Sequence, residues 1–171
     1  MELLERNKTS ILQRWFNLIA ETYPAEVSAF LREKDRFSNP VGYTVSQETS
    51  ALYDELLKTQ ADSDRVCAAL DSIVRIRAIQ DFSPHEAIAF VFLLKEAIKQ
   101  ELGTGIDRSI SFGEWLDFEP RIDRLASVAF DIYMKCREKV YELRVNELKA
   151  ERARMCRLLE LTTGGVADVT L

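Results

Sequence analysis

The sequence is poor in histidine and cysteine, and both shortages exclude classes of protein. His85 is the only histidine, and the three cysteines are far apart and show no CxxC spacing. Common zinc sites need several such ligands at fixed spacings, and disulfide scaffolds need a dense, even set of cysteines. The sequence therefore predicts neither a zinc domain nor a disulfide framework, and its cysteine usage fits a reducing compartment.

Two further absences concern positive charge and long apolar runs. Lysine and arginine number 23 against 28 acidic residues, and the formal net charge of −5 argues against non-specific nucleic-acid binding. The longest apolar run, Ala87 to Leu94, is far shorter than the roughly 20 residues of a membrane-spanning helix. The N-terminus lacks the apolar core and cleavage site of a signal peptide. We therefore expect a cytoplasmic protein with no nucleic-acid partner and no membrane insertion.

The motifs that usually carry chemistry are also missing. His85 is the only histidine that a Ser-His-Asp arrangement could use, and no G-x-S-x-G motif accompanies it. Gly103-Thr104-Gly105 follows a predicted helix and lacks the third glycine and the βαβ context of a nucleotide loop. No HExxH or ExxH motif organises the carboxylates around a metal. We therefore expect no enzyme, with no catalytic residues, no metal site and no cofactor.

What the sequence does contain is helical periodicity, without convincing strand alternation, so the predicted fold class is all-α. Hydrophobic residues make up 47% of the chain and charged residues 30%, as in an ordinary globular domain. Capping motifs and prolines mark the helix starts. The predicted helices are Leu3 to Glu21, a short one from Pro24, one opened by a Thr44–Gln47 capping box, one capped at Asp62 or Ser63, and one from Pro84 to about Leu102 behind a Ser83–Glu86 capping box.

The segment from Gly103 to Pro120 is predicted to be a long connection. Connections of this length are uncommon and often functional. This one carries the aromatic residues Phe112, Trp115 and Phe118 among acidic neighbours. Two interpretations remain open, a surface for a partner protein and a lid of aromatic side chains packed over the core.

The C-terminal part of the sequence predicts one long helix. No proline or glycine occurs from Arg121 to Leu161, which corresponds to roughly 60 Å of helix at 1.5 Å per residue. A globule of the preceding residues would measure only about 35 Å across, so the helix is expected to protrude. Its first apolar stripe has spacings of three and four and can face the core of its own domain; the stripe consists of Leu125, Val128, Ala129, Ile132, Cys136, Val140 and Leu143.

A second stripe follows with heptad spacing and predicts a coiled-coil dimer seam of about three repeats. Arg152 occupies an a-type position of this seam, where it would cost stability and could fix the register. Cys156 lies in a basic run, and nearby cations lower the pKa of a thiol, so a redox role and a small seam residue are both open. The predicted dimer-interface residues are Tyr141, Leu143, Val145, Leu148, Met155 and Leu159.

Two blocks of the sequence are similar to a known family. Asp35-Arg36-Phe37-Ser38-Asn39-Pro40-Val41-Gly42-Tyr43 resembles the signature of the RsbRD-type N-terminal domain of RsbT co-antagonist proteins. The stretch from Ile73 to Pro84, IVRIRAIQDFSP, resembles the second conserved block of that family, and Ala87 to Lys95 follows it in the same way. The resemblance covers about residues 3 to 145.

The resemblance implies a globin-like helical domain without haem that dimerises across its last helices and senses signals in bacterial stress-response assemblies of the stressosome type. The helix that would carry the usual haem histidine, Asp64 to Gln80, contains none. In full-length co-antagonists the last helix leads into a STAS domain, whereas this sequence ends after the linker helix. We therefore expect a stand-alone sensor that acts on a separate regulatory or effector protein.

Taken together, the sequence predicts three segments. Residues 1–143 form a globin-like sensor domain, residues 144–161 form a protruding helix that pairs two copies, and residues 162–171 form a flexible tail. The predicted function is signalling through protein–protein interaction. Two alternatives from other classes are a small-ligand-binding protein with a pocket between the third, fourth and fifth helices, and an accessory protein that docks on a redox or enzyme complex.

Overall fold

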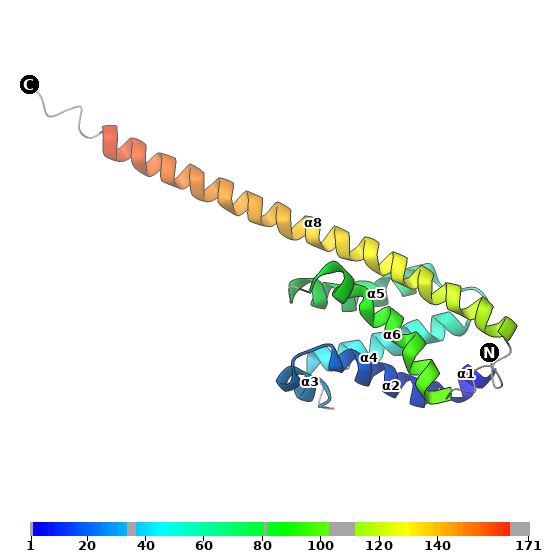
Figure 1. Ribbon diagram of the computed structural model, residues 1–171. Helices are drawn as coiled ribbons and strands as arrows, with labels where there is room; N and C mark the ends of the chain where they lie inside the picture. Colours follow the sequence, from blue (N-terminus) through cyan, green and yellow to red (C-terminus); the bar gives the residue numbers. More distant parts are fainter. Residues whose placement is uncertain (1, 34–36, 81, 103–111, 165–171) are drawn as a thin grey trace, which may run out of the picture. The chain divides into compact units, whose positions relative to one another are not determined.

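A computed structural model describes residues 2–33, 37–80, 82–102 and 112–164, with side chains up to Leu159 except that of Phe112. Within these ranges the protein forms seven helices and no strand, which confirms the predicted all-α, globin-like fold (Figure 1). The helices are α1 (Glu2–Arg6), α2 (Lys8–Glu21), α3 (Ala25–Leu31), α4 (Pro40–Leu57), α5 (Ser63–Ile79), α6 (Pro84–Leu102) and α8 (Phe112–Gly164).

The chain divides into two units, Met1–Met134 and Lys135–Leu171, and α8 begins in the first and continues into the second. In the first unit α4 packs along α5, and α2 packs along α6. Trp15 of α2 lies at the centre of this core, fully buried, and its indole Nε1 donates a hydrogen bond of 2.6 Å to the Phe90 carbonyl oxygen of α6. A buried indole N–H needs such a partner, so this bond fixes how α2 lies on α6.

The N-terminal half of α8 is tied by polar contacts to α6 and to the turn before it. The Tyr133 hydroxyl donates to the Phe82 carbonyl oxygen at 2.8 Å, in the turn between α5 and α6. Lys95 of α6 forms ion pairs with Glu119 and Asp123 at 2.9 and 2.8 Å. Burial opposes the charge on Lys95, but hydrogen bonds to Asp123 and Glu119 raise the pKa of this ammonium group. α6 and the first part of α8 therefore run side by side in opposite directions.

Two of the predicted helix starts are confirmed. The Asp62 side chain accepts hydrogen bonds from the backbone N–H groups of Asp64 and Arg65, as an N-cap does. Before α6, the Glu86 carboxylate accepts a hydrogen bond of 2.9 Å from the Ser83 backbone N–H, which is the Glu half of the predicted capping box. These caps were readable because they depend on residues close together in sequence.

The predicted start of the third helix at Thr44 is wrong, because α4 already begins at Pro40. The N-cap is Asn39, whose Oδ1 accepts a hydrogen bond from the Gly42 backbone N–H at 2.8 Å. The Thr44 hydroxyl instead donates to the Pro40 carbonyl oxygen one turn back. The Asn39 amide nitrogen also donates to the carbonyl oxygens of Leu31 and Glu33 at 2.8 Å, so one side chain joins the end of α3 to the start of α4.

Gly42 is required beside this cap. A Cβ atom at position 42 would collide with the Asn39 side chain and with the Leu31 carbonyl oxygen. The Asn39-Pro40-Val41-Gly42 sequence therefore encodes a tight junction between α3 and α4, in which proline supplies the first helical residue. Within the first motif that resembles the RsbRD family, Asp35 and Arg36 lie outside the described residues.

Three further predictions about the helices need correction. The predicted first helix is divided at Asn7 into α1 and α2, although the hydrogen bond from Ile11 N–H to the Asn7 carbonyl oxygen continues the helical pattern. In the short helix α3, Val27, Phe30 and Leu31 were expected to face the core, but Val27 and Phe30 are 39% and 43% exposed. Residues 112–120 belong to α8 rather than to a connection, and Pro120 lies inside that helix. Residues 103–111 of the predicted connection lie outside the described residues.

Candidate interaction surfaces

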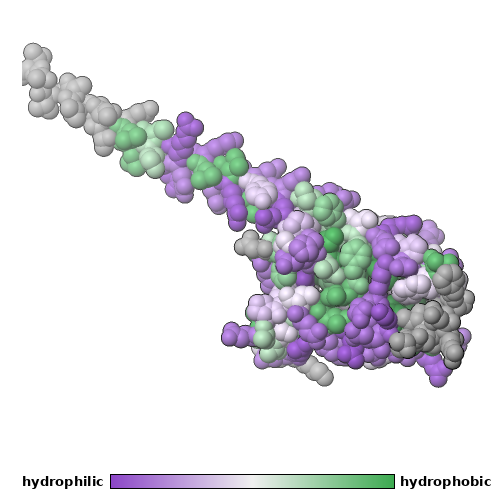
Figure 2. Space-filling model, in the orientation of Figure 1, coloured by the Kyte–Doolittle hydropathy of each residue, from purple (hydrophilic) through white to green (hydrophobic). Residues whose placement is uncertain are grey.

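The second unit presents large apolar side chains that are exposed on a single helix. Their exposed fractions lie between 46% and 65%, although apolar side chains of this size are commonly buried. They include all six residues predicted for the dimer interface, together with Leu158; the set is Tyr141, Leu143, Val145, Leu148, Met155, Leu158 and Leu159. Figure 2 shows the corresponding hydrophobic surface interspersed with hydrophilic residues along the C-terminal part of α8.

The six predicted interface residues are not equivalent. Five of them recur at steps of four and three along α8 if Arg152 is counted, and we name these five, Tyr141, Val145, Leu148, Met155 and Leu159, the α8 seam. Leu143 falls outside this spacing. It was also assigned to the core stripe, but it is 54% exposed and therefore does not pack in a core. The burial of that stripe ends earlier, with Ala129 buried and Val140 only partly buried.

Local contacts within α8 orient Tyr141, the first residue of the seam. The Arg137 guanidinium donates to the Tyr141 hydroxyl at 3.1 Å and lies 5.1 Å from the centre of the Tyr141 ring. Arg137 and Tyr141 are one helical turn apart and the contacts between them are exposed, so each contact contributes little to stability. Lys139 and Glu142 form a similar exposed ion pair at 3.1 Å. Tyr141 is thus oriented by its own helix while half of its surface stays accessible.

The aromatic residues predicted as a partner surface separate in the structure. Phe118 is completely buried, so its side chain cannot contact a partner. Trp115 is partly buried, and its ring centre lies 6.4 Å from that of Phe118, while Leu116 is half exposed. The side chain of Phe112 lies outside the described residues. Phe118 therefore follows the alternative interpretation, in which the aromatic residues cover the core.

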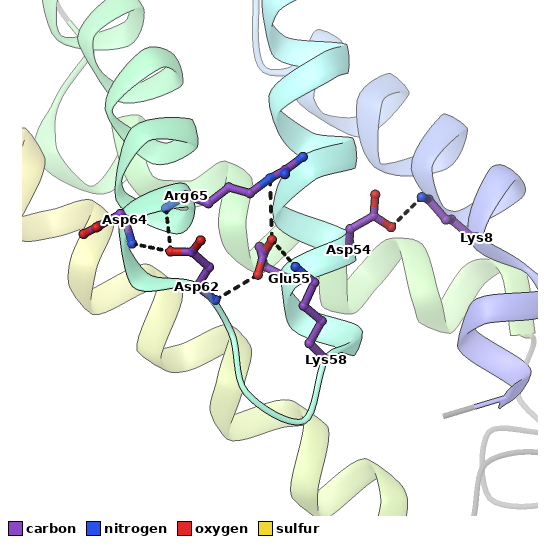
Figure 3. Close-up of polar contacts among 7 residues, drawn as sticks. All are labelled: Lys8, Asp54, Glu55, Lys58, Asp62, Asp64 and Arg65. Atoms are coloured by element: carbon purple, nitrogen blue, oxygen red, sulfur yellow. Dashed lines mark hydrogen bonds and ion pairs between the residues drawn. The ribbon is translucent and has the colours of Figure 1, made fainter.

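A buried carboxylate organises the connection between α4 and α5 (Figure 3). The Glu55 side chain is only 1% exposed and accepts hydrogen bonds from Lys58 Nζ at 2.6 Å and from the Asp62 backbone N–H at 2.9 Å. Arg65 Nε lies 3.5 Å from the same carboxylate. The hydrogen bonds from Lys58 and Asp62 lower the pKa of Glu55, although burial opposes this effect. Because each partner closes the α4–α5 connection, we assign this cluster a structural role.

A surface groove of about 680 Å³ adjoins this cluster. It lies between the α4–α5 connection and the first part of α8, within the first unit. Arg121 crosses the groove and donates to the carbonyl oxygens of Leu56 and Lys58 at 3.1 and 2.6 Å, which completes the C-terminal end of α4. The groove combines apolar walls, such as Val128, with charged side chains, such as Arg124.

The reactive side chains considered from sequence lie apart from one another. His85 is exposed, and its Nδ1 is 3.0 Å from the Ser83 hydroxyl. Cys156 is exposed on the C-terminal part of α8, and Gly103 to Gly105 lie outside the described residues. Over the described ranges, no group of three or more His, Cys, Asp or Glu side chains is arranged to hold a metal ion. No helix there is both long and apolar enough to cross a membrane.

Comparison with known families finds a match for most of the chain. Residues 9–148 match the model of the RsbT co-antagonist protein RsbRD N-terminal domain. The chain belongs to this family. The match includes the Asn39 junction, the described core apart from Leu4 and the first residues of the α8 seam, and the family supports a signalling module related to the stressosome.

One curated relative comes from Archaeoglobus fulgidus and carries the name "Uncharacterized protein". It is 24% identical to this chain over 167 residues, which cover 95% of this chain and 98% of the relative. The two proteins therefore share the C-terminal segment as well as the helical domain. No solved structure matches.

Proposed function

We propose that this RsbRD-family domain is a haem-free sensory module of the cytoplasm that pairs with a second copy through the α8 seam and signals to a separate effector protein. The observation that carries the proposal is the exposure of the five seam side chains, of which Leu148 and Met155 are the most exposed at 65% and 63%. The family supports the signalling role.

Pairing would bury these side chains against their counterparts. Full burial of a leucine or methionine side chain contributes about 1.5–3 kcal/mol, so a seam of five residues from each copy can stabilise a dimer. Arg152 interrupts the seam, and in a parallel pair it lies next to Glu151 of the other copy, since a- and g-type positions are neighbours there. This opposite charge favours the parallel arrangement, in which both sensor domains lie at the same end.

The first unit also exposes large apolar side chains. Phe92 on α6 and Phe130 and Met134 on α8 are each 40–44% exposed, on the two helices that the Lys95–Asp123 ion pair holds side by side. Along α8, these residues precede the seam.

The proposal is tested by the molar mass of the full chain in light scattering. The wild type should have twice the protomer mass of 19.6 kDa. The double variant Leu148→Glu with Met155→Glu should be monomeric, because four carboxylates would face one another in the paired state. The matched control, Asn146→Glu with Ala153→Glu, adds the same charges outside the seam and should remain dimeric.

Two results would contradict pairing through the seam. One is a wild type with the mass of a single protomer at high micromolar concentration, and the other is a seam variant that keeps the dimer mass. Circular dichroism of both variants shows whether the helices are intact, so that loss of the dimer is separated from loss of the fold.

Small-ligand binding is a second candidate function, favoured by the groove beside Arg121 and Arg124. This groove lies at the α4–α5 connection and α8, and not between α4, α5 and α6 as predicted from sequence. Native mass spectrometry of the gently purified protein would detect a bound small molecule directly, because a retained ligand adds its mass to that of the chain. A spectrum with the mass of the polypeptide alone would favour the interaction module.

A further inference from the structure

Arg77 on α5 carries a guanidinium group that is buried without a hydrogen-bonded carboxylate among the described residues. The residue is 1% exposed. Its Nη2 donates to the Thr22 hydroxyl and to the Glu86 carbonyl oxygen, both at 3.1 Å. Within the described part of the chain, Nε and Nη1 have no hydrogen-bond partner. Unpaired buried charges are costly, so this group requires an explanation.

Among the described residues, the acidic side chain close to Arg77 is already engaged elsewhere. The Glu86 carboxylate accepts the Ser83 backbone N–H at 2.9 Å and also contacts the Ser83 hydroxyl. Only the main-chain oxygen of Glu86 reaches Arg77. The hydrogen bonds with Ser83 lower the pKa of Glu86, which keeps this carboxylate charged at the start of α6.

Aromatic rings surround the guanidinium group instead. Its Cζ atom lies 4.2 Å from the centre of the Phe82 ring, 5.2 Å from that of Tyr23 and 6.0 Å from that of Phe90. Ring faces attract a cation, but they offer no acceptor to the N–H groups that point outward in the plane of the guanidinium. Among the described residues, two of the three nitrogen atoms thus keep N–H donors without an acceptor at hydrogen-bond distance.

Of the three rings, Phe82 offers the route to solvent. Phe90 is completely buried and Tyr23 is 8% exposed, whereas Phe82 is partly exposed in the turn before α6. Tyr23 also brings a polar group to this place, since its hydroxyl donates to Gln80 Oε1 at 3.2 Å. A guest that enters past Phe82 would find the buried, unpaired N–H groups of Arg77, the Tyr23 hydroxyl and apolar rings.

We propose that Arg77 anchors a binding site for a small planar monoanion, a carboxylate, that accepts hydrogen bonds from its unpaired N–H groups. Charge-assisted hydrogen bonds between guanidinium and carboxylate are among the strongest in proteins. The three ring centres lie 4.2–6.0 Å from Cζ and crowd the guanidinium, so a flat anion fits beside it better than a tetrahedral one. The site lies wholly within the first unit, apart from the α8 seam.

The site has a direct connection to α8. The Phe82 carbonyl oxygen accepts the hydrogen bond of Tyr133, a buried residue of α8 close to the end of the first unit. A guest that displaces Phe82 would therefore disturb this bond. The idea that the anion is the signal rests on the proposed signalling function. The binding of the anion itself does not depend on pairing through the seam.

The test measures the melting temperature of the full chain in sodium formate, sodium acetate and sodium sulfate against sodium chloride at equal ionic strength. Formate or acetate should raise it saturably, by roughly 5–10 °C at one hundred times the dissociation constant. Arg77→Met should abolish this rise. Arg75→Met, an exposed arginine of the same helix paired with Asp71, should retain it.

The outcomes separate the site from a structural arginine. In chloride, Arg77→Met should melt no lower than the wild type, because it removes an unpaired buried charge while keeping most of the volume. No saturable rise in the wild type, or an equal rise in Arg77→Met, overturns the proposal. If Arg77→Met fails to fold, calorimetry replaces it as the test. The wild type should then bind acetate and Arg77→Gln should not. Light scattering of the same samples reports pairing independently, so failure of either proposal is recognised separately.

Discussion

The junction between α3 and α4 permits a sharp test of which residue begins α4. Replacing Asn39 by alanine removes a completely buried side chain that makes three hydrogen bonds. The Gly42 N–H then loses its cap, and the carbonyl oxygens of Leu31 and Glu33 lose their donor. Thr44→Ala is the matched control, since Thr44 was the cap predicted from sequence and makes only an exposed bond within the helix.

The expected magnitudes follow from these contacts. Loss of an N-cap costs about 1 kcal/mol, and each of the two other lost hydrogen bonds costs about 0.5–1.5 kcal/mol. Asn39→Ala should therefore lower the free energy of unfolding by about 2–4 kcal/mol. Thr44→Ala should change it by less than about 0.5 kcal/mol, because alanine is a strong helix former at a surface position.

Urea denaturation followed by circular dichroism measures both values, and equal m-values would show that the unfolded states are comparable. Asn39→Asp adds a further check. It keeps the acceptor for the Gly42 N–H but turns an oxygen toward the carbonyl groups of Leu31 and Glu33, so it should be at least as destabilising as alanine at neutral pH. The reasoning would be refuted if Asn39→Ala cost less than about 0.5 kcal/mol, or if Thr44→Ala cost as much as Asn39→Ala.

Two further predictions concern the core and the α4–α5 connection. Ile73→Ala should cost about 2–5 kcal/mol in urea denaturation and Ile79→Ala less than about 0.5, since these isoleucines of one helix are 0% and 76% exposed; equal losses would contradict the described packing of α5. Glu55→Gln should cost about 1 kcal/mol at neutral pH through weaker bonds to Lys58 and Asp62. Because the folded state lowers the pKa of Glu55 from 4.5, its contribution is complete above that pH and is lost as the pH falls through the folded pKa. The stability difference between wild type and Glu55→Gln should therefore shrink in acid, and a difference that stays constant down to pH 3 would exclude this role.

Much of the fold could be read from local patterns. Apolar residues at helical spacing identified the helices, and the caps at Asp62 and Ser83 lie within three residues of the groups that they bind. The seam was also readable, because a stripe of regular spacing on one helix requires no knowledge of other helices. Its side chains are exposed as such a stripe requires, while the pairing itself stays a prediction.

The failures share a physical cause, which is that a distant part of the chain decided the outcome. The cap at Asn39 also binds the end of α3, a contact that its short-range pattern does not reveal. Pro120 was expected to precede the last helix, since proline usually interrupts one, but the surrounding segment packs as helix with Phe118 in the core. For Phe118 the sequence left a partner surface and a lid over the core both open, and the packing of the first unit decides for the core.

The sequence by itself determined an all-α domain of the RsbRD family and a long helix with an apolar stripe, because helical periodicity and family motifs are properties of residues near one another. Only the tertiary structure decided the surroundings of Arg77. Its spacing from Leu70, Ile73 and Val74 puts it on the apolar face of its helix, unlike Arg75, but the sequence does not reveal what surrounds its charge. The structure buries one and exposes the other, since Tyr23, Phe82 and Phe90 from three separate segments close around position 77. The cost of burying a charge is set by all of these neighbours together, and their convergence is a property of the fold.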